Sequence, residues 1–179
     1  TRTLRTADDA RLGGSRAQRD LLEFRRTLEA DCAYYAALRA TEVDRAHLKT
    51  AYEALQACYG SDRNRDLEAE GAADARFHLA IAEASHNMVL LHTIRGLFDL
   101  LKRNVVTNIG GMYALRSETR LMLVEQHQAL FAAIMQGRAE DARKIASEHI
   151  SYVQDVLAQS QEENRRMARA QRRERSPTR

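Results

Sequence analysis

The chain has 179 residues, of which 44% are hydrophobic and 30% are charged, and its formal net charge is only +3. This length and composition are typical of one soluble globular domain. No apolar run approaches the roughly 20 residues that cross a bilayer, and residues 1–18 lack the apolar core of a signal peptide. Two cysteines, Cys32 and Cys58, fall inside helical patterns, which argues against a disulfide framework. We therefore expect a cytoplasmic protein that does not contact membranes.

The sequence predicts an all-α chain. Its one proline is Pro177, its glycines are few, and no stretch alternates as a strand does. We expect a flexible arm over residues 1–14, a folded domain over 15–160 and a basic tail over 161–179. Helices are predicted over about 15–39, 41–59 (with Thr41 as the N-cap), 66–84, 87–106, 115–135 and 139–161. The last helix either ends there or continues into the tail, and the short connections favour an antiparallel bundle.

Apolar residues at helical spacing predict the buried face of each helix. In the first helix this stripe consists of Leu21, Phe24, Leu28, Cys32, Tyr35 and Leu38. In the fifth helix it is Leu123, His127, Leu130 and Ile134, and in the sixth it is Ile145, His149, Tyr152 or Val153, and Val156. Two histidines therefore lie on faces that point into the bundle.

Asp74, His78, His127 and His149 are candidate ligands of one divalent transition metal. Asp74 and His78 are four residues apart, so their side chains project from one helical face. His127 precedes Arg138 by 11 residues and His149 follows it by 11, which places both about 16 Å from the turn, at one height on neighbouring helices. Two buried imidazoles at one height need either hydrogen-bonded carboxylates or a shared ion. Imidazole and carboxylate together suit Zn²⁺, Ni²⁺, Mn²⁺ or Fe²⁺.

The other histidines and the arginine-rich tail have simpler interpretations. His47 and His92 fall among charged neighbours and His86 lies in a predicted loop, so all three are expected at the surface. A basic tail can hold nucleic acid by counterion release. A solvated or frayed helix end explains the same composition. The tail arginines are Arg165, Arg166, Arg169, Arg172, Arg173, Arg175 and Arg179.

Three segments are similar to the motifs of one protein family. They are LLEFRRTLE at 21–29, DARFHLAIAEASHN at 74–87, and EQHQALFAAI at 125–134 followed by GRAEDA at 137–142 and by His149. Together they cover about residues 20–158 and resemble the effector-binding (FCD) domain of GntR-type bacterial transcription regulators of the FadR subfamily. The resemblance implies an antiparallel bundle of six or seven helices around a central cavity for a metal and a ligand.

The resemblance also implies roles for individual residues. Metal-containing members use one Asp and three His, which match the four candidate ligands named above. A small carboxylate is the implied effector, with Arg25 as its bidentate partner and Asn87 as a second ligand-binding residue. Capping of a helix is an equally good interpretation of Asn87.

Regulators of this type are expected to form homodimers and to read operator DNA through an N-terminal winged helix-turn-helix domain, to which nothing in this chain is similar. Residues 1–14 are interpreted as a remnant of the linker from that missing domain. We therefore expect a ligand-sensing domain that is not an enzyme. The alternative is a helical-bundle metalloenzyme acting on a small carboxylate, for which Glu83 and Glu125 are poorly placed general bases. A purely structural dimerisation bundle is the third interpretation.

Overall fold

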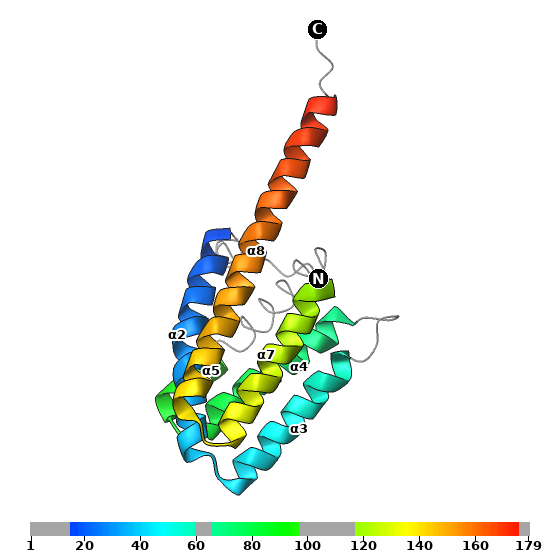
Figure 1. Cartoon of the computed structure of the whole chain (residues 1–179). Coiled ribbons are helices and arrows are strands. Elements are labelled where there is room, and N and C mark those ends of the chain that lie inside the picture. The colour runs from blue at the N-terminus through cyan, green and yellow to red at the C-terminus, as the bar shows by residue number, and fades with distance from the viewer. Residues whose placement is uncertain (1–14, 60–65, 97–116, 176–179) are drawn as a thin grey trace, which may run out of the picture.

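The computed structural model describes residues 15–59, 66–96 and 117–175. These residues form six helices and no strand, which confirms the predicted all-α bundle (Figure 1). None of these helices is both long and apolar enough to span a membrane. The helices are α2 (Ser15–Arg39), α3 (Glu42–Tyr59), α4 (Leu67–Ala84), α5 (Met88–Gly96), α7 (Ser117–Met135) and α8 (Ala139–Arg175).

Several predicted features fall outside the described residues. They are the arm over 1–14, the second half of the helix predicted to end near 106 and the start of the helix predicted from 115. The central cavity also remains a prediction.

Side-chain caps fix where the helices begin. Thr41 is the N-cap of α3, as predicted: its Oγ1 accepts from the Asp44 N–H at 3.2 Å, and the Asp44 carboxylate accepts from the Thr41 N–H at 2.8 Å. Asp66 caps α4 by accepting the N–H groups of Glu68 and Ala69, both at 3.0 Å. Each of these helices therefore has its first turn stabilised by side chains close to it in sequence.

Gly137 closes the hairpin between α7 and α8. Its φ is +70°, and the N–H groups of Gly137 and Arg138 bond the carbonyls of Ile134 and Ala133 at 3.0 and 2.9 Å. This is the Schellman arrangement, in which a left-handed residue satisfies the last carbonyls of a helix. The hairpin sets the register in which α7 and α8 pack side by side.

The helices pack in pairs around one core. The most extensive contacts join α2 to α8, α3 to α4 and α7 to α8, and α2 also contacts α4 and α7. Figure 1 shows α2 and α8 running alongside each other in opposite directions. Alanines on α2 and α7, including Ala33, Ala36 and Ala133, are fully buried, which allows the backbones to approach closely. The larger core side chains include Leu48, Leu55, Phe77, Ile81, Leu130 and Ile134.

The predicted buried stripe of α2 is partly wrong. Phe24 and Leu38 are 38% and 57% exposed, whereas Leu22 is buried. The inward face of this helix instead carries two charged residues, Arg25 and Glu29, with alanines beyond them. The prediction counted only apolar side chains, and it could not foresee that charges on this helix would find partners inside the bundle.

Helix α8 continues into the basic tail, which was the second of the two predicted alternatives. It is unbroken to Arg175, so the part of the basic tail that the structure describes is helical. In Figure 1 this last section extends beyond the ends of α2 and α7.

Replacing Gly137 with alanine is expected to lower the free energy of unfolding by about 1 kcal/mol, because a left-handed conformation costs an L-residue roughly that much. An added Cβ would meet only the Ala37 carbonyl at 3.6 Å, an ordinary contact, so the cost is conformational. Urea denaturation measures the change. Gly96→Ala is the control, since nothing lies within 4 Å of its added Cβ. Equal stabilities for the two variants would contradict this account of the hairpin.

Candidate metal centre

Three histidines from three helices meet inside the bundle. His78 on α4, His127 on α7 and His149 on α8 are all buried, and one ring nitrogen of each lies within 4.8 Å of the others. The ring centroids of His127 and His149 are 4.5 Å apart. The equal spacing of these two residues from the α7–α8 turn therefore places them together, as the sequence predicted.

Asp74 completes the predicted group. Its Oδ1 lies 3.2 Å from Nε2 of His127, and its Oδ2 lies 3.9 Å from Nε2 of His78. Asp74 thus lies against two of the three clustered histidines, His127 and His78. Carboxylate and imidazole side chains in this number are a donor set for a divalent transition metal.

A second ring of residues holds the outer nitrogens of the imidazoles. Nδ1 of His78 lies 2.8 Å from Oε2 of Glu29. Nδ1 of His127 lies 3.1 Å from the Tyr59 hydroxyl oxygen, and Nδ1 of His149 lies 3.0 Å from Oε1 of Gln126. Each neighbour can accept a hydrogen bond from Nδ1–H. The Nε2 lone pair then points away from that neighbour, as in metal-bound histidines.

Two Nε2 atoms of the cluster are buried without a hydrogen-bond partner among the described residues. Within the described part of the chain, Nε2 of His78 and Nε2 of His127 are buried without a hydrogen bond of acceptable geometry. Buried polar atoms are rarely left in this condition. A cation among the three imidazoles and Asp74 would satisfy both atoms, so the residues present fit a metal ion.

Arg25 lies behind this cluster, where it pairs with Glu29. The side chain is buried, and its Nε and Nη2 contact the Glu29 carboxylate at 2.6 and 3.4 Å. Glu29 in turn accepts from His78, so α2 and α4 are joined by a continuous polar chain. Two guanidinium nitrogens are thus engaged by Glu29, and three of the five N–H donors of an arginine remain for other acceptors.

Both carboxylates of this cluster, Glu29 and Asp74, are held in the charged form. Burial alone would raise the pKa of Glu29, but the charge of Arg25 and the His78 contact hold that pKa well below its usual range. Burial acts in the same way on Asp74, where the His127 contact and the charges of His78 and Arg25 hold the pKa equally low. Two negative charges therefore persist inside the bundle at neutral pH.

Two of the histidines respond to burial in opposite directions. Burial lowers the pKa of His78, but the adjacent Glu29 and Asp74 carboxylates outweigh it and raise that pKa above the ordinary value. At His149, burial and the charges of His127 and His78 lower the pKa well below 6.5. His149 is therefore a neutral donor at neutral pH, whereas an incoming ion must displace a tightly held proton from His78.

The other candidate residues lie elsewhere. Oδ1 of Asn87 accepts the N–H groups of Val89 and Leu90 at 3.1 and 3.2 Å, so Asn87 caps α5, and its role in ligand binding stays a prediction. His47, His86 and His92 are exposed, as expected.

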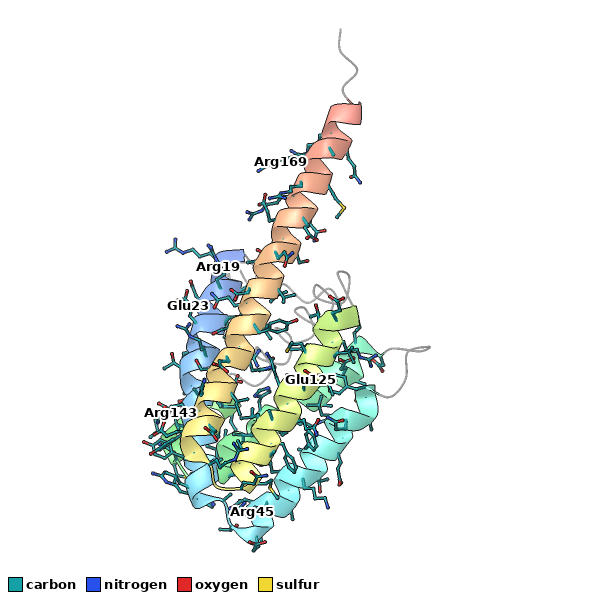
Figure 2. All side chains as sticks on the ribbon, in the orientation of Figure 1. Arg19, Glu23, Arg45, Glu125, Arg143 and Arg169 are labelled. Carbon is teal, nitrogen blue, oxygen red and sulfur yellow. The ribbon has the colours of Figure 1, made fainter. Side chains whose placement is uncertain are left out.

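Neither carboxylate considered as a general base lies in the cluster. Glu83 is partly exposed and pairs with Arg95 at 2.7 Å. Glu125, labelled in Figure 2, is exposed on α7.

A family model described as the FCD domain matches residues 20–152. The chain belongs to the FCD family. This confirms the resemblance found in the three sequence motifs, and the match covers all four candidate ligands and the residues behind them.

Relatives of this FCD domain are named as regulators. A putative L-lactate dehydrogenase operon regulatory protein of Escherichia coli K12 is 43% identical over 150 residues, which are 84% of this chain and 55% of that protein. The Glc operon transcriptional activator of the same strain is 31% identical over 77% of this chain and 54% of its own length. The HTH-type transcriptional regulator LutR of Bacillus subtilis is 31% identical, over 82% of this chain and 64% of its own length. The chain thus spans about half to two thirds of the length of these relatives.

Sequence reasoning missed Glu29, Tyr59 and Gln126. The four-residue spacing of Arg25 and Glu29 is a signal that could have been used, although the same spacing is common on helix surfaces. Nothing comparable marked Tyr59 or Gln126, because each meets its histidine across a helix interface.

Removing one ligand or one supporting acceptor is expected to weaken metal binding to different degrees. His127→Ala should lose the ion on dialysis, because it removes a donor atom. Gln126→Leu should keep the ion but lower the affinity about 10- to 100-fold, since partners behind a ligand contribute that much. Metal content by elemental analysis and competition with a fluorescent chelator measure both effects.

Gln128→Leu is the control for Gln126→Leu, because Gln128 lies on the same helix with an exposed side chain. Full metal retention by His127→Ala, or equal affinities of the two glutamine variants, would refute the assigned centre.

Metal affinity is expected to rise with pH. The proton held on His78 competes with the ion, so affinity should increase about tenfold per pH unit for one displaced proton until the raised pKa of His78 is passed. The free energy of unfolding of the metal-free protein should instead fall above pH 6.5. A histidine whose pKa is raised by folding adds stability that is complete below its unfolded pKa, and this stability is lost as the pH rises through its folded pKa. Titrations with the chelator and urea denaturation at each pH test the two slopes; an affinity independent of pH would contradict the prediction.

Proposed function

We propose that this FCD domain is the ligand-sensing part of a GntR-type transcription regulator. In this proposal Asp74 and the three histidines bind one divalent transition metal. The metal and Arg25 anchor a small carboxylate, and its binding alters how a homodimer of the full-length regulator contacts operator DNA. Membership of the FCD family and the names of the relatives support the regulatory role.

The observation that supports a bound metal is the cluster of three imidazoles together with the hydrogen-bond acceptors behind them. Three buried imidazoles present nitrogen atoms within 4.8 Å of one another, and each has its other nitrogen against a hydrogen-bond acceptor. Fixed acceptors of this kind orient metal-bound histidines and select their tautomer. An ion held there would act as a Lewis acid toward an oxygen ligand.

Charge balance supports an anionic effector. Neutral histidines contribute no charge to the loaded centre, and the Glu29 and Asp74 carboxylates cancel two of the three positive charges of a divalent ion and Arg25. One positive charge then remains in a buried site, where an unpaired ion is costly. A singly charged carboxylate would neutralise it. Four protein ligands leave room for such an oxygen when the ion is five- or six-coordinate.

L-Lactate is the first effector to test. The relative that is 43% identical is named for the L-lactate dehydrogenase operon. A 2-hydroxy carboxylate offers a carboxylate for Arg25 and a second oxygen for a metal, so its chemistry fits both parts of the proposed site.

Helix α2 is the proposed route from the site to DNA. It supplies Arg25 and Glu29, and in regulators of this type the DNA-reading domain precedes the FCD domain. An effector that pulls on Arg25 would change the position of α2 only if it binds two arrangements of the bundle with different affinity.

L-Lactate is expected to stabilise the metal-loaded protein and to leave the chelator-treated protein unchanged. At 100 times the dissociation constant a ligand adds about 2.7 kcal/mol, which corresponds to a rise in Tm of roughly 5 °C or more for a domain of this size. Differential scanning fluorimetry measures the shift, with D-lactate as the stereochemical control. A shift that survives chelation would contradict a metal anchor, and consumption of L-lactate would favour an enzyme.

The Arg25 contact is tested by the double variant Arg25→Met with Glu29→Gln. Changing both residues avoids leaving one buried charge unpaired. The variant should retain the ion and weaken effector binding about 10- to 100-fold, the range expected for a hydrogen bond to a charged group. Calorimetry compares the double variant with the unmodified chain, both saturated with metal. Unchanged affinity would remove Arg25 from the binding site.

A further inference from the structure

The C-terminal section of α8 has no role in the proposed sensing function. Helix α8 is 37 residues long, and its last section extends past the rest of the bundle (Figure 1). Every residue from 164 to 172 is exposed, whereas buried positions recur along the preceding part of the helix as far as Ser160. We call residues 164–172 the α8 arm.

The α8 arm carries a one-sided pattern of positive charge. Arg165, Arg169 and Arg172 are spaced at i, i+4 and i+7, so they share one face of the helix over about 10 Å. Arg166 lies beside them and pairs with Glu162 at 3.2 Å. The sequence of the arm, NRRMARAQR, contains no acidic residue. In Figure 2 the side chain of Arg169 points away from the axis of α8.

A second copy of this chain is a poor partner for this face. Pairing of long helices needs apolar side chains every three or four residues along a seam. Met167 is the one large apolar residue of the arm, and its other non-polar residues are alanines. A row of guanidinium groups would repel the same row on a second copy.

Duplex DNA matches the arm in charge and in shape. DNA carries one negative charge per roughly 3.4 Å of its axis on each strand, so about three phosphates of one strand fall within the length of a 10 Å row of arginines. Guanidinium groups bind phosphate oxygens bidentately, and a single helix has the width of the major groove. The arm has no aromatic side chain for stacking on bases. Contact with the backbone, independent of base sequence, is what this composition supports.

We propose that the α8 arm binds the phosphate backbone of duplex DNA through Arg165, Arg169 and Arg172. This contact is separate from the DNA-reading domain of the proposed regulator, because it lies at the end of α8, beyond residues 20–152 that match the FCD domain. It would hold the sensing domain against DNA without specifying the site, and it requires neither the metal nor the effector.

The test measures binding of this chain to a fluorescent 20-base-pair duplex of random sequence by anisotropy, at several salt concentrations. Three neutralised phosphates should make the affinity fall about 40-fold between roughly 50 and 200 mM salt. In the Arg165→Gln/Arg169→Gln/Arg172→Gln variant, the slope of log affinity against log salt should become shallower by about 2.7. Circular dichroism and metal content should match those of the unmodified chain.

Two matched variants isolate the cause. Arg26→Gln/Arg76→Gln/Lys144→Gln removes three exposed charges from the bundle and should leave the slope unchanged. Arg165→Lys/Arg169→Lys/Arg172→Lys keeps the charge and should retain most of the binding. The proposal is overturned if the arm variant and the bundle variant lose affinity equally, if the chain shows no binding at low salt, or if poly-glutamate competes as well as DNA, which would identify an acidic protein surface as the partner.

Discussion

The ion pair between Arg25 and Glu29 sets the charge on the inward face of α2, and the contact behind His78 depends on it. Each charge would be costly alone inside the bundle, and the pair lowers that cost only because further groups satisfy it. Glu29 also accepts from His78, and Asp74 balances the positive charge from the opposite side. The pair therefore allows a carboxylate to lie behind His78, on a helix face that would otherwise favour apolar side chains.

The polar residues form a layer between two apolar clusters. Along α2 they lie between Leu22 and Ala30, and along α7 His127 lies between Leu123 and Leu130. Four contacts cross helix boundaries in this layer: α2 to α4 through Glu29, α4 to α7 through Asp74, α3 to α7 through Tyr59, and α7 to α8 through Gln126. Apolar packing tolerates small shifts in register, but directional bonds do not. The layer therefore fixes how the helices are aligned as well as where an ion would be held.

The parts of this structure that were predicted from sequence depend on local rules. Helix spans follow from periodicity and from caps such as Thr41, and the meeting of His127 with His149 follows from equal distances to one turn. The four-residue spacing of Asp74 and His78 suggested them as further ligands, and the family resemblance then supported the grouping. Tyr59 and Gln126 could not be found in this way, since each meets its histidine across a helix interface. The error in the predicted buried face of α2 has the same origin. Phe24 is 38% exposed because none of the described helices covers its face of α2.

The continuity of α8 has a mechanical consequence. The helix contains no proline or glycine between Ala139 and Arg175, so it behaves as a stiff rod that passes through the centre at His149 and ends outside the bundle. Arg169 lies 20 residues beyond His149, a distance of about 30 Å along the axis. A tilt of about 5° at His149 would therefore displace Arg169 by roughly 2.6 Å. Because α8 is a rigid rod, a small tilt of the helix at His149 produces its largest movement at the C-terminal end of α8.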